Sequence, residues 1–357
     1  MATVLHITSG LGVGGAETML IQLASRLQRA GHPQHVISLS DHNELAPVLE
    51  QKGIDVTRLK IQSVWGGLAA ILQMRAIISK ISPDVIQGWM YHGNLAATLA
   101  YLLAGRQRVR LYWGLRASNV DDERYRRIIQ WNALLSGLPY MVIANSVAGA
   151  GFHKNRGFHP RRMEVVANGI DTDRFRPDIE ARAAFRATLG FRPDDIVLIH
   201  VARVDPMKAH DVFLSAMKKV PNLKAVLVGT GTEGLQVPPN VLALGARFDV
   251  EKLYPGADIV VSSSAFGEGF SNAIAEGMSA GLVPVATNVG DATRIIDGVG
   301  VVVPPNNPDA LAFAMREVAG LPLEMLRARG LAARNRIVQE FGIARAVEDF
   351  TRLYLGS

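Results

Sequence analysis

Two cations that could bind a diphosphate follow an apolar run in the second half of the chain. Arg203 and Lys208 stand five residues apart, directly after a predicted strand over residues 196–202. The carboxyl ends of strands in a doubly wound sheet border the ligand crevice. An arginine fork and a lysine point charge suit diphosphate oxygens. Such a pair also occurs as ordinary surface charge, so both interpretations stay open at this point.

Two glutamates further along the chain could bind hydroxyl groups. Glu268 lies on a predicted glycine-rich loop, and Glu276 lies eight residues later, inside a predicted helix. Ser271 could cap that helix, whose first free N–H groups would face an anion. An ionised carboxylate only accepts hydrogen bonds, which suits sugar or ribose hydroxyls. The alternative for Glu276 is a carboxylate that stabilises the helix N-terminus.

A glycine-rich turn follows the first predicted strand. Gly10, Gly12 and Gly15 satisfy the GxGxxG spacing of dinucleotide-binding proteins. The acidic residue expected about twenty positions further on is missing, because Asp41 lies 26 residues beyond Gly15. A NAD-dependent dehydrogenase and a plain strand-to-helix turn both remain as alternatives.

The elements that must position these residues alternate between strand and helix. Apolar runs separated by amphipathic segments predict an α/β fold with parallel sheets covered by helices on both faces. The first helix is predicted over residues 16–30, and Gly31 would end it. The predicted strands are 3–9, 35–39, 54–59, 84–88, 109–113, 140–144, 163–167, 196–202, 225–229, 241–244, 259–262, 283–286 and 300–303.

The alternation weakens near residue 175, which predicts two Rossmann-like domains over residues 1–175 and 176–340. Residues 308–356 look almost wholly helical, with breaks near Pro322 and Gly342. We expect the last helix, over about residues 341–357, to pack back on the first domain.

The composition excludes several chemistries. The chain has 357 residues, 48% of them hydrophobic and 20% charged, as in a globular protein. It has no cysteine, which excludes disulfides, thiolate zinc sites, iron–sulfur clusters and a cysteine nucleophile, and favours a reducing cytosol. The N-terminus does not read as a signal peptide. Residues 128–152 lack Asp, Glu, Lys and Arg, but their Asn and Pro residues predict helix, turn and strand rather than a membrane span.

The net charge of +6 lies entirely in the first half of the chain. Residues 1–180 hold 20 Lys and Arg against 14 Asp and Glu, whereas residues 181–357 hold 18 of each. Such an excess attracts nucleic acid, a phosphorylated acceptor or an anionic membrane surface. An ordinary solvated surface is the alternative. A cluster of arginines carries part of the excess: Arg106, Arg108, Arg110, Arg116, Arg124, Arg126 and Arg127.

Six segments fall in the order found in one enzyme family, and the chain resembles that family over nearly its whole length. The family is the retaining glycosyltransferases of family 4 (GT4). The segments are GGAE at 14–17, VANGIDTDRF at 166–175, the pair Arg203 and Lys208, VGTG at 228–231, the pair Glu268 and Glu276, and GLVPVAT at 281–287.

The resemblance implies the GT-B fold, in which two Rossmann-like domains with parallel sheets face across a cleft. By similarity, Arg203 and Lys208 would neutralise the donor diphosphate as it leaves, and Glu268 would contact the transferred sugar. Glu276 would take the ribose hydroxyls. Further donor contacts would come from Gly14 and Gly15 of the first domain, from the backbone of Gly269, Phe270, Ser271 and Asn272, and from the base-reading residues Arg247 and Phe248.

The first domain departs from the family pattern at one position. Many family members have a histidine that contacts the transferred sugar where this chain has Arg116, at the end of the segment LYWGLR. His92, in WMYHGN at residues 89–94, follows the preceding strand and could also reach the cleft. We therefore regard both His92 and Arg116 as catalytic candidates. The two segments are similar to those of bacterial surface-polysaccharide enzymes in this family.

The implied activity is retaining transfer of a hexose-type residue from a UDP- or GDP-sugar to a glycan or lipid-linked acceptor. It needs no cofactor and no metal, since Asp171 and Asp173, although they spell DxD, lie within a structural segment of the family. The location would be cytoplasmic, peripheral on the inner face of the plasma membrane, without a nucleic-acid partner. The alternatives are a nucleotide-sugar isomerase or phosphorylase and a non-catalytic glycan- or nucleic-acid-binding protein.

Overall fold

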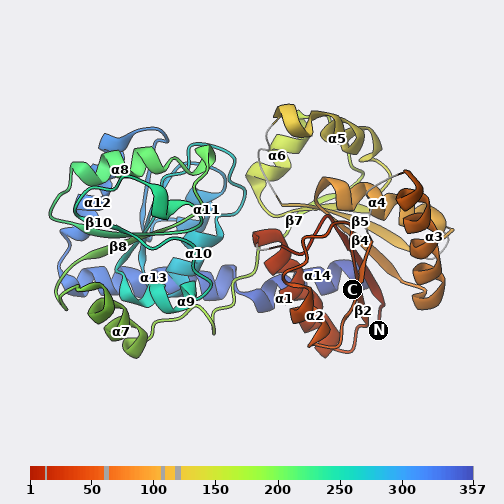
Figure 1. Cartoon of the computed structure of the whole chain (residues 1–357), viewed down its shortest axis with the longest axis horizontal. Coiled ribbons are helices and arrows are strands. Elements are labelled where there is room, and N and C mark those ends of the chain that lie inside the picture. The colour runs from red at the N-terminus through yellow and green to blue at the C-terminus, as the bar shows by residue number, and fades with distance from the viewer. Residues whose placement is uncertain (13, 60–63, 106–108, 117–121, 357) are drawn as a thin grey trace. The chain divides into compact units, whose positions relative to one another are not determined.

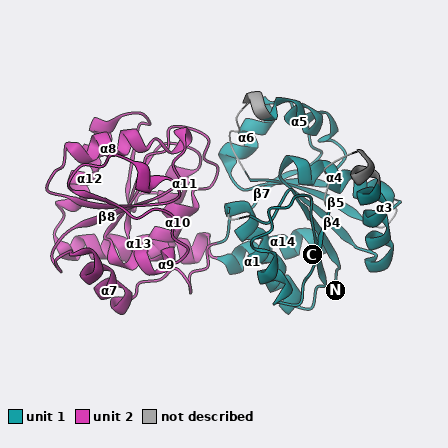
Figure 2. Ribbon diagram, viewed as in Figure 1, with its two compact units in different colours: residues 1–169, 343–357 teal, residues 170–342 magenta. Residues whose placement is uncertain are grey.

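The computed structural model describes residues 1–12, 14–59, 64–105, 109–116 and 122–356, with only the backbone at 64–68 and 122–124. The chain divides into two compact units (Figure 2). Unit 1 comprises Met1–Gly169 and Ile343–Ser357, and unit 2 comprises Ile170–Gly342.

The boundaries differ slightly from the predicted divisions after residues 175 and 340. Residues 170–175 belong to unit 2 because their backbone is bonded there. Ile170 donates to the carbonyl of Phe341 (2.8 Å), and the carbonyl of Phe175 accepts from Ser279 Oγ (2.6 Å). The Phe175 ring also packs edge-on against Tyr254, with 6.0 Å between centroids.

Unit 1 contains a seven-stranded parallel sheet in the order β3-β2-β1-β4-β5-β6-β7. Its strands are β1 (Val4–Thr8), β2 (Gln34–Ser38), β3 (Asp55–Arg58), β4 (Val85–Trp89), β5 (Arg110–Leu115), β6 (Met141–Ala144) and β7 (Met163–Val165). Its helices are α1 (Gly15–Arg29), α2 (Ala46–Glu50), α3 (Val64–Ile81), α4 (Met90–Leu103), α5 (Asp122–Leu135), α6 (Val147–Asn155) and α14 (Ile343–Leu355).

Apolar side chains on both faces of this sheet make two cores. In β5, Tyr112 joins the cluster on the face of α1 and α14, whereas Leu111 and Trp113 join the cluster on the opposite face. This is the alternation that strand geometry imposes. The expected return of the last helix is seen here, since Phe350 and Tyr354 of α14 are buried in unit 1.

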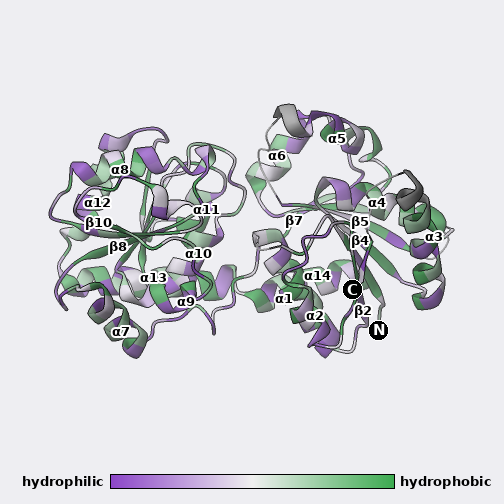
Figure 3. Cartoon of the chain, in the orientation of Figure 1, coloured by the Kyte–Doolittle hydropathy of each residue, from purple (hydrophilic) through white to green (hydrophobic). Residues whose placement is uncertain are grey.

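Unit 2 contains a six-stranded parallel sheet in the order β10-β9-β8-β11-β12-β13. Its strands are β8 (Val197–Val201), β9 (Lys224–Val228), β10 (Val241–Ala243), β11 (Ile259–Ser262), β12 (Val283–Thr287) and β13 (Val301–Val303). Figure 1 shows its helices around the sheet, and in Figure 3 the strands of both units are mostly hydrophobic. The helices are α7 (Ile179–Leu189), η1 (Pro206–Lys208), α8 (His210–Lys218), η2 (Thr232–Gly234), α9 (Val250–Leu253), η3 (Tyr254–Gly256), α10 (Asn272–Ser279), α11 (Ala292–Ile296), α12 (Pro308–Ala319) and α13 (Leu323–Glu340).

The predicted α/β fold with two parallel Rossmann-like sheets is confirmed. Every predicted strand is present, and each begins and ends within two residues of its predicted bounds. Helix α1 ends as expected, with Gly31 in the left-handed conformation (φ 86°). Residues 128–152 form parts of α5 and α6 with β6 between them. Among the described helices, none is long and apolar enough to cross a membrane.

Each sheet has one point at which the strand order reverses. In unit 1 this point lies between the neighbours β1 and β4, and in unit 2 between the neighbours β8 and β11. Connections leave such a pair in opposite directions, which opens a crevice at the carboxyl ends of the strands. The loops that follow these four strands are therefore the places to examine for a site.

Candidate functional site

The loops after β8 and β11 bring together a cation and a carboxylate. The Lys208 ammonium contacts the carboxylate of Glu268, and both side chains are largely buried. Ser264 Oγ donates to the same carboxylate oxygen, Glu268 Oε1, at 2.8 Å. The charges are thus paired directly at the reversal point of the unit 2 sheet. Such a pair can exchange its contacts for those of a ligand that carries both an anion and hydroxyls.

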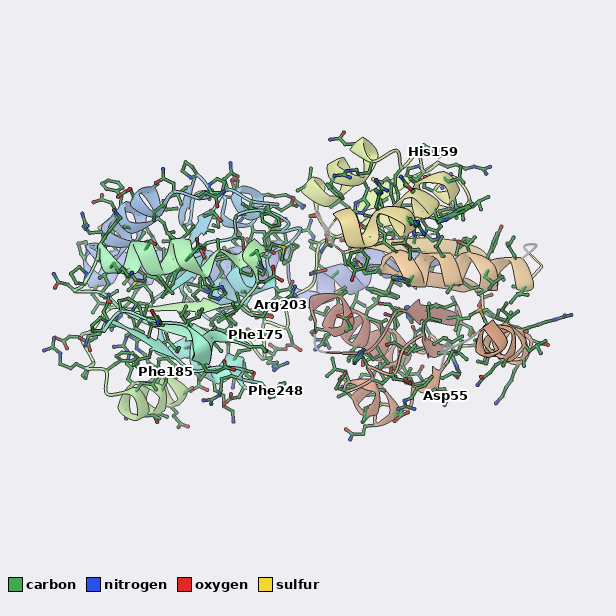
Figure 4. The ribbon with its side chains drawn as sticks, turned by 45° about the horizontal axis from the view of Figure 1, so that its top comes forward. Asp55, His159, Phe175, Phe185, Arg203 and Phe248 are labelled. Carbon is green, nitrogen blue, oxygen red and sulfur yellow. The ribbon has the colours of Figure 1, made fainter. Side chains whose placement is uncertain are left out.

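Arg203, the other predicted cation, lies on the loop after β8 (Figure 4) and is 64% exposed. Its Nε and Nη2 both donate to Asp205 Oδ2, at 3.3 and 3.2 Å. Asp205 Oδ1 accepts from the backbone of Met207 at 2.9 Å, at the start of η1. Asp205 therefore orients the guanidinium, whose Nη1 is not used by this contact.

The loop that carries Glu268 rests on a second turn. Gly290, which follows β12, has φ 63°, and a Cβ there would lie 2.5 Å from the carbonyl oxygen of Gly269. Asp291 donates its backbone N–H to that same carbonyl at 3.0 Å. Only glycine can stand at position 290 without displacing the Glu268 loop.

Helix α10 begins at the crevice after Ser271, at the predicted N-cap position. The Ser271 side chain makes no capping hydrogen bond, contrary to expectation. The first N–H groups of a helix have no intrahelical acceptors, so they suit an anion. The Phe270 side chain is buried and packs against Phe341, with 5.4 Å between ring centroids. Only the backbone of Phe270 is therefore suited to ligand contact.

Glu276 lies in α10 and bonds to a tyrosine rather than to a cation. Tyr254 Oη donates to Glu276 Oε2 at 3.3 Å and to the carbonyl of Ala273 at 3.1 Å. Burial raises the pKa of Glu276 to about 7, although Tyr254 and the charge of Arg174 act in the opposite direction. The group can therefore change its charge near neutral pH.

The predicted base-reading loop follows β10. Phe248 is 79% exposed and is labelled in Figure 4, so its ring is accessible to a ligand. Arg247 forms a bidentate ion pair with Asp249, in which Nε donates to Oδ1 at 2.8 Å and Nη2 donates to Oδ2 at 2.7 Å. Gly229 donates its N–H to the carbonyl of Gly245 at 2.8 Å, which ties this loop to the end of β9.

In unit 1 the glycine turn follows β1 at the reversal point of its sheet. Gly14 is the N-cap of α1, with extended backbone and no side-chain cap. The Glu17 carboxylate folds back over Gly14 into the space that a Cβ would occupy. Gly15, the first residue of α1, is exposed. The turn therefore presents backbone and one carboxylate.

His92 lies in the first turn of α4, directly after β4, on the other side of the same reversal point. Its side chain is exposed, and its ring meets the edge of Tyr125 at 6.5 Å between centroids. Partial burial lowers the pKa of His92. A neutral, accessible imidazole can both donate and accept a hydrogen bond.

Arg116, the second candidate in unit 1, is buried at the end of β5. Its guanidinium lies 5.0 Å from the ring centre of Trp89 and 5.3 Å from that of Phe350. Nη1 donates to Asn168 Oδ1 at 3.1 Å, whereas Nε and Nη2 have no partner among the described residues. Burial lowers its pKa to about 10, so the group stays charged.

The sequence did not reveal four of the residues that orient these groups. Asp205 and Asp249 each stand two residues after an arginine, and this repeated spacing was a usable signal. Ser264 and Tyr254 contact residues far from their own elements, and no spacing pointed to them. Asp171, the first residue of the DxD sequence, has a structural role, since its Oδ1 accepts a hydrogen bond from the backbone N–H of Arg174 at 3.2 Å.

Comparison with known proteins gives the class of enzyme. A family model described as Glycosyltransferase Family 4 matches residues 13–174, and one described as Glycosyl transferases group 1 matches residues 195–320. The Anabaena protein HepE, solved in complex with UDP, has a TM-score of 0.87 at 21% identity, covering 99% of this chain and 100% of that chain. HepE has also been solved with UDP-glucose, with a TM-score of 0.87 at 20% identity, covering 100% of both chains. The fold is that of the GT-B glycosyltransferases.

Curated relatives carry the name D-inositol 3-phosphate glycosyltransferase. The relative from Mycobacterium sp. (strain KMS) is 34% identical over 157 residues, covering 39% of this chain and about a third (35%) of its own length. The relative from Streptomyces scabiei (strain 87.22) is 27% identical over 386 residues, covering 95% of this chain and 85% of the relative. Because the two family models together match residues 13–174 and 195–320, the chain belongs with the family 4 glycosyltransferases.

Proposed function

We propose that the chain transfers a sugar, with retention of anomeric configuration, from a UDP- or GDP-sugar to a glycan or lipid-linked acceptor. The observation that carries this proposal is the pair of Lys208 and Glu268 beside the start of α10, at the reversal point of the unit 2 sheet. One partner suits the diphosphate and the other suits the sugar hydroxyls. That HepE binds UDP and UDP-glucose supports a nucleotide-sugar donor.

In the proposed reaction the bond between the anomeric carbon and the diphosphate oxygen breaks as the acceptor oxygen bonds to that carbon. Negative charge grows on the leaving phosphate while the sugar gains oxocarbenium character. Lys208 and Arg203 interact with that negative charge as it develops, which stabilises the transition state more than the ground state. The leaving phosphate takes the acceptor proton, so the protein supplies no separate base and needs no metal.

The remaining predicted residues complete the proposed donor site. Glu268 accepts a hydroxyl of the transferred sugar, and Glu276 accepts the ribose hydroxyls. Phe248 stacks on the base, with Arg247 at its edge. For unit 1, the assignments of Gly14 and Gly15 to the diphosphate and of His92 and Arg116 to the sugar stay predictions.

The test is thermal stabilisation by UDP, GDP, ADP and their sugar conjugates. A ligand at a hundred times its Kd adds about 2.7 kcal/mol to the free energy of unfolding, which a melting curve resolves. We expect one diphosphate to raise the Tm of the native chain and not that of Lys208→Ala. Lys218→Ala, at the exposed far end of α8, is the matched control and should respond like the native chain. Equal responses of the two lysine variants would contradict the donor-site assignment.

We further propose that unit 1 binds an anionic membrane surface, where a lipid-linked acceptor would lie. From Arg124 to Met163 the sequence has seven Lys and Arg and no Asp or Glu. Within this stretch Trp131, Leu134 and Leu138 are 58%, 64% and 46% exposed. Trp131 and Leu134 lie about one helical turn apart on α5, and Leu138 lies in the segment that follows the end of that helix. Exposed apolar residues among cations suit the interface of an anionic bilayer.

A further inference from the structure

The backbone that presents Lys208 has an unfavourable conformation. Lys208 ends η1, and the next residue, Ala209, has φ 45° and ψ 55° before α8 begins. Residues with a Cβ rarely adopt this left-handed conformation, which glycine adopts freely. Because Ala209 follows Lys208 directly, its dihedral angles decide how the chain turns at the lysine. Contacts from elsewhere in unit 2 must therefore stabilise the turn.

Ser263 supplies such contacts. It follows β11, is fully buried, and its Oγ lies 2.8 Å from the carbonyl oxygen of Lys208 and 3.1 Å from that of Ala209. Carbonyl oxygens only accept, so the single hydroxyl proton of Ser263 is donated to these two groups. A second tie lies beside it, because Ala265 donates its N–H to the carbonyl of Met207 at 2.9 Å. The segment after β11 thus holds the backbone on both sides of Lys208.

His200 of β8 orients the Ser263 hydroxyl. Its Nε2 lies 3.0 Å from Ser263 Oγ, inside the core of unit 2. Since the serine proton points to the carbonyls, Nε2 must carry the proton that it donates to Oγ. This assigns the neutral tautomer with an unprotonated Nδ1, for which no hydrogen-bond partner exists in the described structure. Burial, with the nearby charges of His210 and Lys208, lowers the pKa of His200 and keeps the ring neutral.

The neighbouring serine acts on the other member of the pair. Ser264 Oγ donates to Glu268 Oε1 at 2.8 Å, and the Ser264 carbonyl accepts from Thr287 Oγ1 at 2.6 Å. Two adjacent residues after β11 therefore hold Lys208 through its backbone and Glu268 through its carboxylate. Each position is set relative to the same strand end.

We propose that Ser263, oriented by His200, is a positioning residue that presents the Lys208 ammonium to the donor diphosphate. Together with Ser264 it sets the spacing between the ammonium and the Glu268 carboxylate. This inference rests on the proposed function, in which Lys208 binds that diphosphate.

The test is a double-mutant cycle read out as the Kd of the nucleoside diphosphate that stabilises the native chain most. Ser263→Ala removes the donated proton and releases the Lys208 turn, so we expect about tenfold weaker binding, a typical loss for one hydrogen bond to a buried site. Lys208→Ala should weaken binding by at least as much. In the Lys208→Ala background, Ser263→Ala should cause no further loss, because the serine acts through the lysine.

A rescue and a matched control separate positioning from general destabilisation. Ala209→Gly should restore part of the affinity lost in Ser263→Ala, since glycine adopts the turn without support. Ser136→Ala is the control in unit 1. Ser136 is also fully buried, donates to the carbonyl of Ala133 at 2.7 Å and accepts from the backbone of His159 at 2.9 Å. Its loss should lower the Tm and leave the Kd unchanged.

The outcomes distinguish this inference from the function beneath it. If no nucleoside diphosphate binds, or if Lys208→Ala binds like the native chain, the proposed donor site fails and the positioning role fails with it. If Lys208→Ala binds weakly and Ser263→Ala binds normally, the positioning role alone is overturned. An equal loss from Ser263→Ala in both backgrounds would also overturn it, because the serine would then act independently of the lysine.

Discussion

Tyr254 donates its hydroxyl proton to the carboxylate of Glu276 across 3.3 Å, from η3 to α10. Tyr254 is fully buried and Glu276 is half-buried, and the bond shifts the pKa values of the two groups in opposite directions. Burial and the nearby carboxylate raise the pKa of Tyr254 well above its ordinary value. Burial also raises the pKa of Glu276 to about 7, and the hydrogen bond from Tyr254 offsets part of that rise.

The first prediction concerns stability against pH. The folded pKa of Glu276, about 7, lies above its ordinary value of 4.5, so the folded state binds the proton more tightly. The stability contribution is therefore fully present below about pH 4.5 and is lost as the pH rises through about 7. We expect Glu276→Gln to be more stable than the native chain at pH 8, by roughly 1–3 kcal/mol, and similar at pH 5. Denaturant unfolding at both pH values measures this, and a difference that does not grow with pH would contradict it.

The second prediction concerns the ribose contact proposed for Glu276. Glu276→Ala should raise the KM for the nucleotide sugar more than it lowers kcat, because ribose binding changes little between ground and transition state. Steady-state kinetics with varied donor measure the split. A fall in kcat at unchanged KM would place Glu276 at the reacting sugar instead.

The third prediction concerns charge on the leaving group. Lys208→Ala should lower kcat by about 10- to 150-fold, the effect of losing a charge-assisted contact worth roughly 1.5–3 kcal/mol. Because the proposed reaction needs no metal, a chelator that removes divalent cations should leave the rate of the native chain unchanged. Lys218→Ala serves again as the matched control. Near-native turnover of Lys208→Ala would remove the lysine from the reaction.

The fourth prediction concerns Arg116, whose buried guanidinium has two nitrogens without a partner in the described structure. A buried cation without a carboxylate partner is costly, and apolar replacements of similar volume are often neutral or stabilising. Arg116→Met should therefore keep or raise the Tm while lowering kcat about tenfold or more, as for a lost contact to a charged group. Calorimetry measures the Tm and steady-state kinetics measure kcat, both on the same preparation of Arg116→Met. A lower Tm with unchanged kcat would make Arg116 a packing residue of Trp89 and Phe350.

The fifth prediction concerns the exposed side of α5. Trp131→Ala and Leu134→Ala should each weaken binding to vesicles containing phosphatidylglycerol several-fold, since each removes about 1–2 kcal/mol of apolar contact. Phe313→Ala in unit 2 is the control, because Phe313 is as exposed, at 61%. Co-sedimentation at low and high salt measures the binding. Equal binding to phosphatidylcholine vesicles, or an equal effect of Phe313→Ala, would contradict the assignment.

Much of the fold was predictable because strands buried on both faces read as apolar runs between amphipathic helices. Residues 170–175 lie in unit 2, although the predicted division follows residue 175, and this difference has a physical reason. What keeps Phe175 in unit 2 is its ring contact with Tyr254 and the hydrogen bond from Ser279, and neither partner is near in sequence.

The candidate site was predictable where residues lie near one another in sequence, or where the family resemblance orders them. Lys208 and Glu268 were assigned to one donor site, and their contact is present. The residues that orient them, Ser263 and His200, could not be found in this way. Their contact depends on β8 and β11 being neighbours, and the order of strands in a sheet comes from its crossovers rather than from local propensity.

The return of α14 to unit 1 has a consequence for how the chain folds during synthesis. The ribosome delivers residues 1–169 first, but Phe350 and Tyr354, which pack beside Trp89 and Tyr112, emerge only after all of unit 2. Unit 2 is one continuous segment of the chain, so it can fold as soon as it has left the exit tunnel of the ribosome. Unit 1, although made first, must wait with part of its apolar interior uncovered, so the vulnerable period for aggregation belongs to the N-terminal half.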